Sequence, residues 1–167
     1  MNRLLIMAGG VLLATATLLA CGKGKTPEKA EGGEEQAATV SKPVSQLADG
    51  KVKDMDARLF NERIVNLDKG DRKYLSPVPS VIDCYATWCG PCKQLAPLMD
   101  ELAAEYKGKV AFYRVDVEKE PAFTMDLGVS AMPTIFFVNA GNTTSLVGLQ
   151  TRETLKKSID ALLKKKD

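Results

Sequence analysis

The chain has 167 residues, which is room for one domain with additional segments. It carries 23 Lys and Arg against 21 Asp and Glu, so its formal net charge is only +2. This charge gives no electrostatic reason to expect a nucleic-acid partner.

The N-terminal residues have the pattern of a segment that directs export. Arg3 precedes an uncharged run over residues 4–20, which is at the lower limit of length for spanning a bilayer. Residues 18–22 read Leu-Leu-Ala-Cys-Gly and resemble the bacterial lipobox, whose cysteine is lipidated and becomes the first mature residue. We therefore expect residues 1–20 to be a lipoprotein signal peptide and Cys21 to hold the chain on the bacterial membrane, with an uncleaved transmembrane anchor as the alternative. Both interpretations place the remaining chain in the cell envelope, facing the periplasm or exposed on the surface.

The segment that follows is expected to be a disordered tether, over residues 21–50. Residues 22–50 hold no aromatic side chain and mix lysines with glutamates. Such a composition cannot bury a core. The folded domain is therefore expected to span residues 51–167.

The first half of this domain is predicted to hold a helix, a strand and a second helix. Asp56 is placed to cap a helix that runs to about residue 68, and the Gly- and Pro-containing residues 69–80 are typical of a loop. Residues 81–86 are β-branched and aromatic, which is typical of a strand. Apolar residues at three- and four-residue steps then predict a helix over residues 90–106, in which Pro97 should produce a kink.

The second half is predicted to complete a layered α/β domain. Its strand–helix–strand order implies a right-handed βαβ unit, and a hairpin with a covering helix follows. The expected elements are a strand at 110–117, a helix at 120–127, a strand at 134–139, a turn at 140–142, a return strand at 145–147 and a helix from about 151.

Two cysteines lie three residues apart at the predicted start of the helix at residue 90. Cys89 and Cys92 would share one face of the first turn, with Cβ atoms about 5–6 Å apart, close enough for a disulfide after small adjustments. The free amides of a helix N-terminus favour the thiolate of Cys89, the form that attacks disulfides. A structural zinc site would need four N or S ligands, whereas Cys84, Cys89 and Cys92 supply at most three and the chain has no histidine. We therefore expect neither a metal nor a cofactor.

These motifs together resemble the thioredoxin family from about residue 56 to the C-terminus. Residues 88–93 read Trp-Cys-Gly-Pro-Cys-Lys, Asp83 lies six residues before Cys89, and residues 132–134 read Met-Pro-Thr. The resemblance implies an α/β, thioredoxin-like fold, a central mixed β-sheet with helices on both faces. It also implies that Cys89 is an exposed nucleophile and Cys92 a buried resolving thiol. A purely structural disulfide is the alternative.

The resemblance also implies a surface on which substrates dock. Pro133 matches the family's cis-proline, which lies against the active disulfide, and an X–Pro bond tolerates the cis form. The backbone of Met132 would pair with an extended substrate segment. Trp88, Gly90 and Pro91 would contribute to the same surface, although a core position is the alternative for Trp88.

Three further residues are informative: Asp83, a position that the family uses, and Arg114 and Cys84, where this chain departs from the familiar pattern. Asp83 lies in an apolar strand, so burial should raise its pKa, and the resemblance implies that it takes the proton of Cys92, through water. Arg114 stands where many thioredoxins have a lysine near this aspartate; it should hold back the rise in pKa, unless its head only faces solvent. Strand alternation places Cys84 opposite Asp83, which predicts a buried structural thiol, with a third redox-active thiol as the alternative.

The function implied by the resemblance is thiol–disulfide exchange. Gly-Pro between the cysteines resembles the reducing end of the family, so we expect a reductase of disulfide-bonded protein substrates in the envelope. Because that compartment is oxidising, the reductase would need a membrane thiol electron donor. An envelope thiol oxidase and a non-catalytic substrate-binding or chaperone module are the alternatives.

Overall fold

The computed structural model describes residues 44–67 and 73–164. The expected signal peptide, Cys21 and the tether as far as residue 43 lie outside these ranges. Within them, no helix combines the length and the apolar character needed to cross a membrane.

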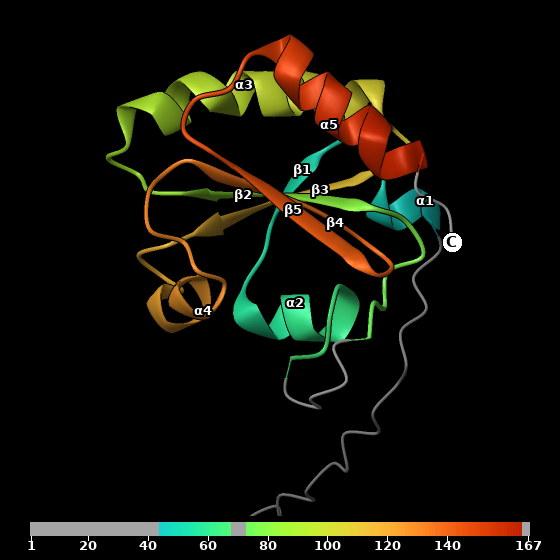
Figure 1. Cartoon of the computed structure of the whole chain (residues 1–167), viewed down its shortest axis with the longest axis horizontal. Coiled ribbons are helices and arrows are strands. Elements are labelled where there is room, and N and C mark those ends of the chain that lie inside the picture. The colour runs from blue at the N-terminus through green and yellow to red at the C-terminus, as the bar shows by residue number, and fades with distance from the viewer. Residues whose placement is uncertain (1–43, 68–72, 165–167) are drawn as a thin grey trace, which may run out of the picture. The chain divides into compact units, whose positions relative to one another are not determined.

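The described chain forms a five-stranded mixed sheet with helices on both faces, as expected. The strand order is β1-β3-β2-β4-β5. Strands β1, β3 and β2 are parallel to one another, β4 is antiparallel to β2, and β5 is antiparallel to β4. In Figure 1, α3 and α5 lie along one face of the sheet, and α2 and α4 lie against the other. The elements are α1 (Val44–Leu47), β1 (Val52–Asp54), α2 (Ala57–Arg63), β2 (Ser80–Tyr85), α3 (Gly90–Glu105), β3 (Ala111–Asp116), α4 (Pro121–Asp126), β4 (Thr134–Asn139), β5 (Asn142–Val147) and α5 (Arg152–Lys164).

The sheet separates two apolar cores, and alternation along each strand sends successive side chains to opposite cores. The core under α3 and α5 contains Val81, Leu95, Met99, Leu102, Phe112, Ile135, Leu155 and Ile159. The core on the α2 and α4 side contains Phe60, Ile64, Ile82, Cys84, Tyr113, Val115 and Phe123. Burial on both faces makes β2 almost wholly apolar, which is why its sequence predicts a strand so clearly.

The domain begins earlier than the expected boundary at residue 51. Helix α1 lies inside the range expected to be tether, and Leu47 and Ala48 are buried in the α2-side core. Lys53 holds this helix end: its Nζ donates to the carbonyl of Leu47 at 3.2 Å and lies 3.1 Å from the carboxylate of Asp49. A helix of four residues is too short to leave a periodic pattern, so the sequence does not reveal it.

Strand β1 and the end of α2 also differ from expectation. Strand β1 was not predicted; it has three residues and owes its place to parallel pairing with β3, a strand distant in the sequence. Asp56 caps α2 as predicted, with Oδ1 accepting the Leu59 N–H at 2.6 Å. However, α2 ends at Arg63 instead of residue 68, because Val65 forms a bridge with Tyr74 and the chain turns back.

Candidate active site

The two cysteines lie where β2 ends and α3 begins, as predicted. Cys89 is the N-cap of α3, and it is joined to Cys92 by a disulfide with a Cα–Cα distance of 5.3 Å. The Sγ atom of Cys89 also accepts the backbone N–H of Cys92 at 3.2 Å. Pro91 fits the first turn because the N–H that it lacks would have no helical partner there. The helix start therefore places one sulfur against a backbone donor that favours negative charge on it.

The disulfide is more enclosed than expected. Cys92 is buried, as predicted, but Cys89 is only 5% exposed, so the expectation of an exposed Cys89 is wrong for this oxidised form. The reason is packing: the two cysteines form a cluster with Ala86, against which Val117 and Met132 also pack. In contrast, Gly90 and Pro91, which stand between the two cysteines, are exposed.

The expected cis-proline lies beside the same cluster. The Met132–Pro133 peptide bond is cis, and Met132 packs against the two cysteines. Trp88 is 64% exposed, so the alternative of a core position is wrong. The structure thus brings Trp88, the helix start and the loop before β4 together at one edge of the sheet.

The sequence did not identify two apolar residues that belong to this edge. Val147 is 57% and Leu149 is 48% exposed, and the N–H of Gly148 between them donates to the carbonyl of Pro133 at 2.8 Å. They reach the site because Val147 pairs with Thr134, at the start of β4. The hairpin register counted from the turn at Gly141 could have indicated that Val147 lies opposite Thr134. However, the return strand is expected only over residues 145–147, whereas β5 begins at Asn142.

Asp83 is buried, as predicted, on the face of the sheet that α3 covers. It is 3% exposed, and its Oδ1 has no hydrogen-bond partner among the described residues. Burial raises the pKa of Asp83 to about 6, and the nearby Arg114 cation holds back the rise. A carboxyl group with this pKa can change its protonation state close to neutral pH.

Arg114 is the register neighbour of Asp83 on β3 and points to the same face. Its guanidinium lies over the ring of Tyr85, 5.7 Å from the centroid, and 3.7 Å from the carboxylate of Asp100 on α3. Its side chain is 27% exposed. The head is therefore only partly exposed and lies beside a ring and an acid, and its cation lowers the pKa of Asp83, against the alternative of a head that reaches solvent and ignores Asp83.

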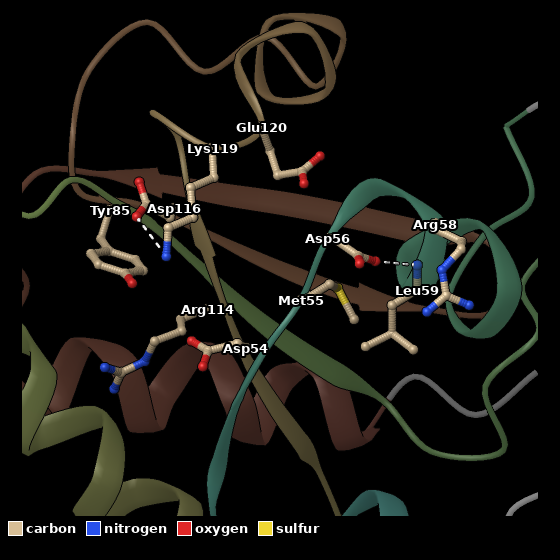
Figure 2. Close-up of a pocket in the computed structure, with 10 residues that line it drawn as sticks. All are labelled: Asp54, Met55, Asp56, Arg58, Leu59, Tyr85, Arg114, Asp116, Lys119 and Glu120. Carbon is tan, nitrogen blue, oxygen red and sulfur yellow. Dashed lines mark hydrogen bonds and ion pairs between the residues drawn. The ribbon is translucent and has the colours of Figure 1, made fainter.

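A small cavity of about 210 Å³ opens beside Arg114, at the ends of β1 and β3. Figure 2 shows Asp116 paired with Lys119 and Asp56 bonded to the N–H of Leu59, so these two carboxylates already serve the fold. The Lys119–Asp116 distance is 3.7 Å. Glu120 accepts the N–H of Ala57 at 3.3 Å. Within the described ranges, no group of three or more Cys, Asp or Glu side chains is placed to hold a metal ion.

Comparison with known proteins identifies the family. The thioredoxin family model matches residues 53–161, which is more than half of the chain. The chain belongs to the thioredoxin family.

Individual thioredoxins are similar to part of the chain. The M-type chloroplastic thioredoxin of Spinacia oleracea is 40% identical over 89 residues, covering 53% of this chain and 49% of that protein. Thioredoxin of Borreliella burgdorferi is 43% identical over 70 residues, covering 42% of this chain and 55% of that protein. The chain thus spans about half the length of these curated relatives. The crystal structure of Malassezia sympodialis thioredoxin (Mala s 13) aligns with a TM-score of 0.56 and 27% identity, covering 68% of this chain and 92% of that chain.

Cys84 stands apart from the cysteine pair of this thioredoxin domain. It is the free cysteine of the described chain, and it is fully buried in the core on the α2 side. Burial and the adjacent Asp83 carboxylate raise the pKa of the Cys84 thiol to about 12. The thiol therefore stays protonated and packs as a small apolar group, as predicted.

Proposed function

We propose that the protein is a thiol–disulfide oxidoreductase that reduces disulfides of protein substrates with the Cys89–Cys92 pair. The observation that carries this proposal is the disulfide at the N-terminus of α3, where Cys89 Sγ faces the N–H of Cys92. A sulfur in that position is favoured as the thiolate, which is the attacking form. The cis Met132–Pro133 bond and the exposed Trp88 support docking of an extended protein segment at this edge.

The reaction starts from the dithiol form. The Cys89 thiolate attacks one sulfur of the substrate disulfide, forms a mixed disulfide and releases the other substrate sulfur as a thiolate. The Cys92 thiolate then attacks Cys89 Sγ and releases the second substrate sulfur. The Cys89–Cys92 bond forms, the substrate gains two electrons and both of its sulfurs end as thiols. Asp83 is buried on the face of the sheet that the helix carrying Cys92 covers, which supports a role for its carboxylate in taking the proton that Cys92 loses.

The direction and the location of the reaction rest on sequence features. Gly90 and Pro91 between the cysteines resemble the reducing members of the family, which favours reductase over oxidase. The uncharged run that ends in Leu-Leu-Ala-Cys at residue 21 supports a lipid anchor on Cys21 and a place in the bacterial cell envelope. In that oxidising compartment the dithiol would be regenerated by a membrane thiol donor.

The test separates the roles of the two cysteines. We expect Cys89→Ser to abolish reduction of insulin disulfides with dithiothreitol as the electron source, because the attacking sulfur is gone. We expect Cys92→Ser to accumulate a mixed disulfide with insulin, visible by non-reducing electrophoresis and mass spectrometry, because the resolving sulfur is gone. Equal trapping by both variants would contradict the assigned roles. Full function in the double serine variant would instead favour a non-catalytic binding module.

A further inference from the structure

The carboxylate of Glu118 holds two side chains of the loop that precedes the disulfide. Trp88 Nε1 donates to Glu118 Oε1 at 3.0 Å, and Thr87 Oγ1 donates to Glu118 Oε2 at 3.1 Å. Trp88 is 64% exposed, so packing fixes its ring only in part. The hydrogen bond from the indole edge therefore sets much of the orientation of the ring.

Glu118 is itself held by the strands that position the cysteines. It follows β3, and its N–H donates to Oδ1 of Asp116 at 3.0 Å, where Asp116 is only 8% exposed. The preceding residue, Val117, donates its N–H to the carbonyl of Tyr85 at 2.9 Å and packs against the cysteine cluster. The carboxylate is thus presented from a turn that is tied to the end of β2.

We propose that Glu118 is a positioning residue that holds the ring of Trp88 in place for docking of protein substrates. This inference rests on the proposed function. With its N–H already bonded, the indole offers its apolar faces to a substrate without leaving a donor unpaired on burial. Holding the ring before binding also removes the cost of ordering it during binding. Glu118 therefore acts on the binding of protein disulfides and leaves the exchange at the sulfur atoms unchanged.

Two substrates of different size test this assignment. Insulin needs the docking surface, whereas 2-hydroxyethyl disulfide is small enough to reach the sulfur atoms without it. For Glu118→Ala we expect KM for insulin to rise about three- to tenfold, the loss typical of one hydrogen bond, with kcat unchanged. The rate with 2-hydroxyethyl disulfide should stay at the parent value.

Two further variants separate hydrogen bonding from charge. Glu118→Gln keeps an oxygen that accepts the indole N–H, so it should restore the parent KM. Asp126→Asn removes one carboxylate from an exposed position on α4 and serves as the matched charge control. Trp88 is the single tryptophan of the chain, so fluorescence anisotropy reports its motion directly. The fluorescence anisotropy of Trp88 should fall in Glu118→Ala and stay at the parent value in Glu118→Gln and Asp126→Asn.

Three results would overturn the inference. The first is a parent KM for insulin and unchanged anisotropy in Glu118→Ala. The second is a Glu118→Gln variant as impaired as Glu118→Ala, which would assign the effect to charge. The third is an equal loss with the small disulfide, which would place Glu118 in the exchange step. A parent protein that reduces neither substrate would instead overturn the proposed function, and this inference with it.

Discussion

Asp83 and Cys84 are neighbours in β2, yet their side chains enter opposite cores and serve different purposes. Burial raises the pKa of both side chains, to about 6 for Asp83 and to about 12 for Cys84. Near neutral pH the carboxyl can therefore gain or lose a proton, while the thiol stays neutral. The same physical cause makes one residue a candidate proton acceptor and the other a packing group.

The buried carboxyl predicts a stability that falls as pH rises. Because the native pKa of Asp83 is above the reference value of 3.8, the native state holds its proton more tightly than the unfolded state does. The free energy of unfolding should thus decrease between pH about 4 and about 6, and stay low above that range. We expect Asp83→Asn to raise it at neutral pH by up to about 3 kcal/mol and to match the parent at acidic pH.

Urea unfolding of the oxidised protein across this pH range measures the effect. Asp126→Asn is the matched control, because Asp126 is an exposed acid on α4, away from Asp83 and Arg114. It should leave the pH dependence unchanged. Parent and Asp83→Asn curves that run parallel at every pH would show that the Asp83 carboxyl is not destabilised by burial.

Arg114 should shift the pH dependence of disulfide reduction. Protonated Asp83 cannot take a proton from Cys92, so the rate should fall below the pKa of Asp83. Arg114→Met removes the cation that lowers this pKa, so the acid limb should move to higher pH. Asp100→Asn removes a competing partner of the guanidinium and should move the limb to lower pH.

The pH–rate profile of insulin reduction tests both expected shifts, to higher pH in Arg114→Met and to lower pH in Asp100→Asn. Arg58→Met is the control, since Arg58 is largely exposed and pairs with Glu62 on α2. An Arg114→Met profile that superimposes on the parent would contradict the pairing. The position of Arg114 beside Asp83 could be predicted from the sequence. Its contacts with Tyr85 and Asp100 could not, because they depend on how α3 lies on the sheet.

Among the helices and strands, those with a long sequence pattern could be predicted and those with a short one could not. Strand β2 and helix α3 could be predicted because continuous burial and a long amphipathic repeat leave clear signals. Helix α1 and strand β1 could not, because they have four and three residues and are stabilised by distant partners. The end of α2 was misplaced because Ile64 is buried outside a helix, so its apolar character does not imply one.

The candidate site shows the same division. The cysteines, Asp83 and the Met132–Pro133 pair stand in local motifs and could be found from the sequence. Val147, Leu149 and Glu118 could not, because strand pairing and side-chain hydrogen bonds bring them to the site from separate elements. Local sequence thus identifies the reacting groups, while the surface that recognises a substrate depends on tertiary structure.

For the whole molecule, the proposal that Cys21 carries a lipid anchor can be tested by substitution. We expect Cys21→Ser to leave an unprocessed or soluble protein with normal thiol activity in vitro, because residue 21 precedes the thioredoxin family match at residues 53–161. Membrane fractionation and intact mass measure the change, and Thr15→Ser, within the same apolar run, is the control. Parent-like fractionation of Cys21→Ser, with no loss of lipid mass, would contradict the lipid anchor.

We propose above that the Cys89–Cys92 pair works as a reductant of protein disulfides. The measurement is the equilibrium reduction potential of this pair. The protein is equilibrated in buffers with defined ratios of reduced to oxidised dithiothreitol, its free thiols are alkylated, and the alkylated fraction is measured by mass spectrometry. We expect a potential near that of thioredoxin, about −270 mV. A potential near about −120 mV, as in a strong thiol oxidant, would contradict it.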